Sequence, residues 1–150
     1  MVTSKFFFKK VTYLLKKNVT FAPSYFSQKN NSNSMDTNEK DRIGKMIAKL
    51  LEEFVTIDSS LYIKKYRIAK YPVTQKLWQE VTGEDTAFCN FKGDCLPVEN
   101  VSWNDCQGFI GKLNDLLALL RENSGFKLRT GEFRLPTEEE WEYAAKGASR

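Results

Sequence analysis

The residues with the most reactive side chains in this sequence are three cysteines and a cluster of glutamates. Cys89, Cys95 and Cys106 carry thiols that could act as nucleophiles or as metal ligands. The glutamates Glu138, Glu139, Glu140 and Glu142 resemble paired carboxylates of the kind used in acid–base catalysis. Histidine is absent, which removes the commonest metal ligand and the usual general base at neutral pH.

The three cysteines do not form a convincing metal site by themselves. A zinc site made only of cysteine normally needs four ligands, and no fourth ligand is evident. One alternative is a Cys89–Cys95 disulfide across a loop in an oxidising compartment, and the other is three free thiols. We favour free thiols, and we expect Cys106 to be a small core residue at the start of a helix.

Helix formation explains the glutamates better than catalysis does. Pro136 fixes the chain, Thr137 is the predicted N-cap, and Glu140 completes a capping box. Carboxylates in the first turn are favoured by the helix dipole, and Glu142 with Lys146 forms an i,i+4 pair. We therefore assign no catalytic residue to this cluster.

The same helix has a predicted apolar face and a predicted end. Trp141, Ala144 and Ala145 recur at helical spacing, and Gly147 is suited to the residue after the C-cap. We expect a short strand at Phe133–Leu135 to lead into it.

Scattered carboxylates in the middle of the chain do not predict a calcium site. Asp85, Asp94 and Glu99 lie in or just after a loop predicted at Glu84–Leu96, with Gly93 as a turn residue. They lack the dense alternating oxygen ligands of a calcium loop. We interpret them as solvated charges.

Charge is distributed unevenly along the 150 residues. The net charge is +4, but residues 1–35 hold six lysines and no acidic residue, which leaves the remainder with 17 basic and 19 acidic side chains. The folded part is therefore not predicted to bind nucleic acid. The apolar runs of residues 1–35 are too short for a signal-peptide core or a membrane span, so a membrane partner is not expected and a cytoplasmic location is favoured.

Residues 1–35 allow three interpretations. They could form an amphipathic surface helix, a disordered tail, or upstream sequence translated before a true start at Met35. We favour the last two, and treat residues 1–35 as a basic tail, residues 36–55 as an amphipathic helix and residues 56–150 as one domain.

Periodicity predicts the remaining elements. The longest amphipathic pattern is a helix at Asp36–Phe54. Strands are predicted at Phe54–Ile57 and Leu61–Tyr71, and two further helices follow. The first helix is predicted to be capped by Thr74 and to end at Gly83, with Leu77, Trp78 and Val81 on its inward face. The second is predicted to be capped by Ser102 or Asn104 and to end near Glu122. Its inward face is formed by Phe109, Ile110, Leu113, Leu116, Leu117 and Leu120. Trp78 is interpreted first as core and second as a contact for a peptide substrate. Asn123–Gly131 is a polar connection that could form a hairpin arm.

Three blocks, in order, resemble the formylglycine-generating enzyme family, also called sulfatase-modifying factors. FRLPTEEEWEYAAKG resembles the family's RLPTE-x-EWEYAA-x-GG motif. LYIKKYRIAKYPVTQKLWQEVTG resembles its opening block, and LPVENVSWNDCQGFIGKLN resembles its P-V-x-x-V-S-W-x-D block. The blocks span about residues 60 to 147. The family's usual P-G-G-x-F-x-M-G strand is absent, and the helix at residues 36–54 stands before the first block instead.

The resemblance implies a C-type-lectin-like α+β fold, present here as its N-terminal part. It also implies oxidation of a substrate cysteine to formylglycine, with molecular oxygen, copper bound by a cysteine pair, and calcium sites. In the family those ligands follow the RLPTE helix, and none of Cys89, Cys95 and Cys106 matches a catalytic position. The later GNVWEW and RGGS…GFR blocks are not among the 150 residues. We therefore predict no catalytic, cofactor-binding or metal-binding residue in this chain, and no copper or calcium bound by it.

Two functional classes stay open. The first is a sulfatase-modifying domain that is inactive without its C-terminal half or a partner chain, and whose substrate is a protein or peptide. The second is a noncatalytic ligand- or protein-binding module on the same scaffold; the nucleotide sequence beyond the codon for Arg150 would separate the two. Because strands expected from a C-terminal part would be missing, we predict open sheet edges and an aggregation-prone monomer.

Overall fold

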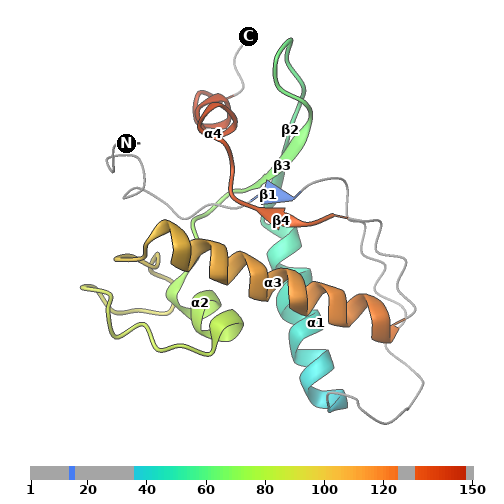
Figure 1. Ribbon diagram of the computed structural model, residues 1–150, viewed down its shortest axis with the longest axis vertical. Helices are drawn as coiled ribbons and strands as arrows, with labels where there is room; N and C mark the ends of the chain where they lie inside the picture. The colour runs from blue at the N-terminus through green and yellow to red at the C-terminus, as the bar shows by residue number, and fades with distance from the viewer. Residues whose placement is uncertain (1–13, 16–35, 125–130, 148–150) are drawn as a thin grey trace.

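The computed structural model describes residues 14–15, 36–124 and 131–147 and places helices and strands in one mixed arrangement (Figure 1). The elements in chain order are β1 Leu14–Leu15, α1 Thr37–Glu52, β2 Phe54–Ile57, β3 Tyr66–Ala69, α2 Gln75–Thr82, α3 Trp103–Ser124, β4 Phe133–Arg134 and α4 Glu138–Ala145. This mixture of helices with a small sheet confirms the α+β class. The lectin-like topology stays a prediction.

The helix predicted at the start of the domain is confirmed as α1. The Asp36 carboxylate caps it by accepting a hydrogen bond from the backbone N–H of Asn38 (3.4 Å). Its apolar stripe is buried, as the spacing predicts, at Ile43, Ile47, Leu50 and Leu51. The helix ends at Glu52, and the chain passes directly into β2.

The sheet is antiparallel, with strand order β2-β3-β1-β4. Its unexpected member is β1, because Leu14–Leu15 belongs to the segment interpreted as a tail. Leu14 pairs with Ile68 of β3 and with Arg134 of β4, so β1 lies between these two strands. The edge of β3 that we expected to be open is therefore paired, while β2 and β4 border the described sheet. The rest of residues 1–35 lies outside the described residues.

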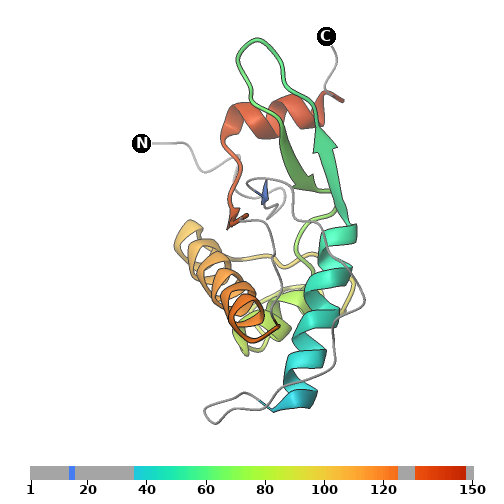
Figure 2. The same ribbon diagram turned by 90° about the vertical axis from the view of Figure 1, so that its right-hand side faces the viewer.

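The strand predicted at Leu61–Tyr71 was too long, because β3 begins only at Tyr66. Ser60 diverts the chain into a turn: its Oγ accepts hydrogen bonds from the N–H groups of Tyr62 (3.4 Å) and Ile63 (3.2 Å). Leu61 and Tyr62 are 93% and 94% exposed as a result. The β2–β3 hairpin carries them beyond the sheet, at the end of the molecule away from α2 and α3 (Figures 1 and 2).

The predicted caps of α2 and α3 are confirmed. Thr74 Oγ1 accepts a hydrogen bond from the N–H of Leu77 (3.2 Å), and Gly83 ends α2 with a φ of 74°. At the start of α3, Ser102 Oγ accepts from the N–H of Asp105 (3.2 Å), and the Asp105 carboxylate accepts from the N–H of Ser102 (2.7 Å). Ser102, rather than Asn104, is therefore the cap. The helix runs to Ser124, two residues beyond the predicted end, and the hairpin arm predicted after it falls largely on residues 125–130, outside the described residues.

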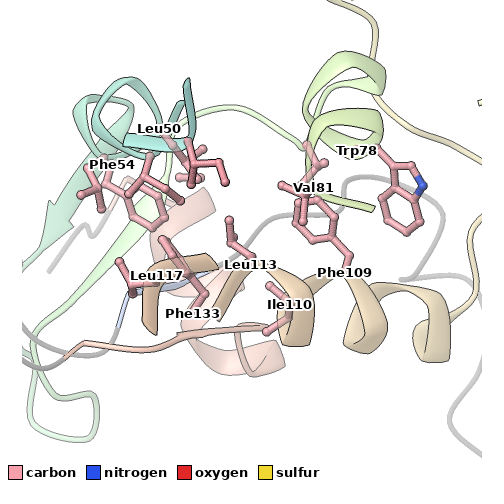
Figure 3. Packing of buried hydrophobic residues seen from close by; sticks show 14 of the residues in the cluster. Leu50, Phe54, Trp78, Val81, Phe109, Ile110, Leu113, Leu117 and Phe133 are labelled. Atoms are coloured by element: carbon pink, nitrogen blue, oxygen red, sulfur yellow. The ribbon is translucent and has the colours of Figure 1, made fainter. Parts of the chain in front are cut away.

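The main core lies between α1, α2 and α3 and is closed on one side by Phe133 of β4 (Figure 3). Trp78 of α2 stacks on Phe109 of α3, with ring centroids 5.1 Å apart and planes 7° apart. Phe54 contacts Phe133 at 5.9 Å between centroids. The core residues labelled in Figure 3 are Leu50, Phe54, Trp78, Val81, Phe109, Ile110, Leu113, Leu117 and Phe133.

Candidate functional site

The hydrogen bonds predicted for the glutamate cluster on α4 are confirmed. Thr137 Oγ1 accepts from the N–H of Glu140 (3.2 Å), and the Glu140 carboxylate accepts from the N–H of Thr137 (2.9 Å). Lys146 Nζ lies 3.1 Å from the Glu142 carboxylate, and Gly147 has a φ of 74°. Glu140 and Glu142 therefore have structural partners, while Glu138 and Glu139 are exposed.

Sequence reasoning missed a second role of Glu140. Its carboxylate accepts two hydrogen bonds from the Arg134 guanidinium, at 2.7 and 2.5 Å, across the Pro136 turn. Tyr66 of β3 donates its hydroxyl hydrogen bond to the backbone oxygen of Glu140. The signal in the sequence is the arginine that precedes the capping box in the RLPTE motif. These contacts attach α4 to the sheet.

The titration of this cluster follows from its partial burial. Burial by itself raises the pKa of Glu140, but the hydrogen bonds from Arg134 and Thr137 outweigh it, so the pKa is lowered. Burial and the nearby Glu140 charge raise the pKa of Tyr66 to about 12. At neutral pH the carboxylate is thus ionised and the phenol is protonated. The pKa of the Glu140 carboxylate and that of the Tyr66 phenol therefore both lie away from neutral pH, where a general acid or base works best.

The apolar face of α4 is narrower than the spacing predicts. Trp141 and Ala144 are partly buried against Tyr66 and Ile68 of β3, whereas Ala145 is exposed. The reason is that α4 packs on a sheet only a few residues wide, so no residue of the helix is fully buried.

The three cysteines are free, and two of them are buried. Cys106 is 1% exposed, which confirms its predicted core position, and burial raises the pKa of its thiol to about 11. Cys89 is 3% exposed, and its Sγ donates to the backbone oxygen of Glu99 at 3.7 Å. Cys95 alone is exposed, on the turn that precedes Pro97. The part of the chain that the structure describes contains no group of three or more Cys, Asp or Glu side chains able to hold a metal ion.

The carboxylate of Glu99 organises the loop between α2 and α3. It accepts hydrogen bonds from the N–H groups of Asn90 (2.5 Å) and Phe91 (2.9 Å), so solvated charge was the wrong interpretation for this residue. Asp85 accepts from the Gln79 amide at 3.3 Å. Glu99 therefore has a structural role in the loop, whereas Asp85 is exposed, as expected of a solvated charge.

Buried Gln75 secures the other side of the same loop. Its Nε2 donates to the backbone oxygens of Phe91 (2.8 Å) and Pro97 (3.3 Å), and its Oε1 accepts from the N–H of Gly93 (3.3 Å). A polar side chain that is 3% exposed is costly unless it is hydrogen-bonded in this way. The loop is consequently held against the start of α2.

A recess of about 410 Å³ lies between α1, the start of α2 and the turn at Asp94 and Cys95. Its lining combines apolar side chains from both helices with several charged ones. Sequence reasoning did not find this recess, because it depends on how α1 packs beside α2 and no local pattern encodes that packing.

No helix within the described ranges combines sufficient length with sufficient apolar content to cross a lipid bilayer.

The α+β arrangement and its capping motifs define a small domain of mixed helices and strands. Comparison with family models identifies it more closely: residues 32–150 match the Sulfatase-modifying factor enzyme 1-like domain. The chain therefore belongs to this family, which confirms the resemblance seen in the three sequence blocks.

Two other comparisons were made. The chain is 32% identical over 114 residues to a protein of Paenibacillus barcinonensis named Chaperone protein LppX, a match covering 62% of this chain. The chain spans 40% of the length of that relative. No solved structure gave a significant match.

Proposed function

We propose that this chain forms the scaffold portion of a sulfatase-modifying-factor domain and does not itself carry the redox centre that oxidises a substrate cysteine to formylglycine. The observation that carries this proposal is the family match over residues 32–150. The three sequence blocks contain β3, α2, the first part of α3, β4 and α4, and α1, which lies before them but inside the family match, adds to the same core. A protein or peptide substrate, and a complementary segment or partner chain bearing the metal ligands, belong to the same proposal.

The cysteines of this chain do not fit the copper that the resemblance implies. Copper held by a cysteine pair requires two thiolates that face the same accessible point. Burial disfavours the thiolate of Cys106, and Cys89 is buried with its thiol directed to a backbone oxygen. Since Cys95 is the one exposed thiol of the three, we assign no step of cysteine oxidation to this chain.

Oxygen uptake tests this proposal. The purified chain is incubated with copper and a synthetic peptide containing a sulfatase-type cysteine, and a complete family member serves as the positive control. We expect oxygen consumption and peptide oxidation in the control and none with this chain. Turnover that disappears in a Cys95→Ser variant would refute the proposal directly.

A noncatalytic binding module is the second candidate, and the name of the relative favours it. That protein is named a chaperone, which is a binding activity without a redox step. Light scattering of heat-aggregating citrate synthase distinguishes the candidates. A binding module of this kind suppresses the scattering in proportion to its concentration, whereas a scaffold portion leaves it unchanged.

A further inference from the structure

The three sequence blocks that carry the family resemblance do not assign the recess between α1 and α2, because α1 stands before the first block, although α1 lies inside the family match over residues 32–150. Its volume, about 410 Å³, falls within the roughly 300–1,000 Å³ that is usual for ligand sites. The turn at Asp94 closes one part of it and is fixed in place: the Lys76 N–H donates to the backbone oxygen of Asp94 (3.2 Å). The recess thus lies between α1, α2 and a turn whose backbone is hydrogen-bonded to α2.

The α1 wall of the recess is positively charged. Arg42, Lys45 and Lys49 all line it, at the i, i+3 and i+7 positions that share one side of a helix. The acidic residues in the first half of the same helix, Glu39 and Asp41, do not line it. The charged residues of α1 that line the recess are therefore all basic.

Two of these cations are not neutralised by the protein. Arg42 donates to the Glu39 carboxylate, and Glu80 across the recess also favours its charged form. For Lys45 and Lys49, which are exposed, no ion pair is present within the described residues. These two ammonium groups are available to carboxylates of a ligand.

The floor beside the lysines is apolar. Met46 of α1 and Leu77 of α2 line the recess and pack on the edge of the main core, and Pro72 lines it from the chain before α2. Methionine is well suited to such a surface because its flexible thioether adapts to different side chains. A ligand that contacts both the lysines and these apolar residues needs carboxylates on one side and apolar groups on the other.

The other charged residues of the lining are of both signs. Lys76 adds a positive charge on α2, while Glu53 after α1, Glu80 on α2 and Asp94 in the loop add negative ones. Arg42 already pairs with Glu39 and lies near Glu80, so the unpaired cations of the α1 row are Lys45 and Lys49. A ligand that lies along α1 meets these two ammonium groups, and carboxylates complement them.

We propose that the recess between α1 and α2 binds a short acidic, amphipathic peptide segment of a partner protein. Its carboxylates pair with Lys45 and Lys49, and its apolar side chains contact Met46 and Leu77. This inference does not depend on the proposed function, because peptide binding at the recess requires no redox step.

Fluorescence anisotropy with a labelled ten-residue peptide of alternating glutamate and leucine pairs tests the proposal. We expect saturable binding to the full chain that weakens as salt is added, and no binding of a matched lysine–leucine peptide. Lys49→Glu should weaken binding about threefold to tenfold, since an exposed charge contact is worth up to about 1 kcal/mol and reversal adds repulsion. Lys49→Arg should retain it.

The matched control is Lys64→Glu, which makes the same charge change at an exposed position in the β2–β3 hairpin, outside the lining. We expect this variant to bind like the unaltered chain. Equal weakening by Lys64→Glu and Lys49→Glu would show attraction by net charge alone and would overturn the proposal, as would failure of the acidic peptide to bind.

Cys95 supplies an independent measurement, because it lines the recess and is exposed. Saturating acidic peptide should slow its labelling by a maleimide severalfold, as followed by mass spectrometry, while buried Cys89 and Cys106 serve as internal references. Binding that leaves the Cys95 labelling rate unchanged would place the peptide elsewhere and reject this site.

Discussion

The helical region and the sheet region of this molecule are held together in different ways. The core between α1, α2 and α3 is a continuous apolar cluster with Ile47, Val73 and Leu113 fully buried. The cluster between β3 and α4 has only Tyr66 and Ile68 buried, with partly buried side chains around them. The helical region therefore gains its stability from apolar burial, and the sheet region depends much more on polar contacts.

The polar contacts of the sheet region converge on one short segment. Arg134 and Tyr66 both bond to Glu140, and Thr137 completes the capping box with it. Each such hydrogen bond contributes roughly 0.5–3 kcal/mol, less than a large buried aromatic ring. In the sheet region, the RLPTE segment therefore holds α4 on the small sheet mainly through the hydrogen bonds of Glu140 with Arg134 and Tyr66.

The largest effect is expected in the helical core. Phe109→Ala removes a ring that is 1% exposed and stacked on Trp78, so the free energy of unfolding should fall by about 3–5 kcal/mol. Trp141→Ala on α4 should cost clearly less, because Trp141 is only partly buried. Urea denaturation followed by circular dichroism measures both. An equal or larger loss for Trp141→Ala would break the comparison between the two regions.

A smaller, pH-dependent effect is expected at Glu140. Glu140→Gln should lower the free energy of unfolding by about 1–2 kcal/mol at neutral pH through the weakened Arg134 contact. The folded-state pKa of Glu140 is lowered, so its contribution is present above the unfolded pKa and is lost as the pH falls through the folded value.

Denaturation at a series of pH values below neutrality checks the sign of that effect. The unaltered chain should lose more stability on acidification than Glu140→Gln does. Glu138→Gln is the matched control, because Glu138 is exposed in the same helical turn. If the two variants lose the same stability on acidification, the Arg134–Glu140 ion pair is not the source of the pH dependence.

The smallest effect on stability is expected at the hairpin tip. Leu61 and Tyr62 are almost fully exposed, so replacing both by serine should change the free energy of unfolding by no more than about 0.5 kcal/mol. The same double variant should reduce self-association, which is measured by light scattering, because exposed apolar side chains promote it. A large loss of stability would mean that the tip is packed in solution.

The unaltered chain tests the predicted aggregation-prone monomer. A monodisperse monomer that unfolds cooperatively would contradict that prediction.

Local signals made most of the fold predictable from the sequence. The Thr74 and Thr137 caps and the Gly83 ending all occur where side-chain chemistry predicts them. Non-local features were not predictable in this way. The pairing of β1 with β3 and β4 depends on partners distant in sequence. The late start of β3 at Tyr66 follows instead from the local turn at Ser60, which the strand pattern did not reveal.

The candidate site shows the same division between local and non-local signals. The core position of Cys106 follows from the helical periodicity around it, and the capping role of Glu140 follows from its spacing to Thr137. The Arg134–Glu140 pair could not be read from helical spacing because Pro136 stands between the two residues. The recess beside Lys45 and Lys49 arises from helix packing, which no motif in the chain records.

Titration of the purified chain with Cu(I), in competition with a chromogenic chelator, tests the central claim most directly. The scaffold account predicts no stoichiometric high-affinity site, because Cys89 and Cys106 are buried and Cys95 lacks an exposed second thiol among the three. One tightly bound Cu(I) per chain, lost on replacing any two of the three cysteines by serine, would contradict it.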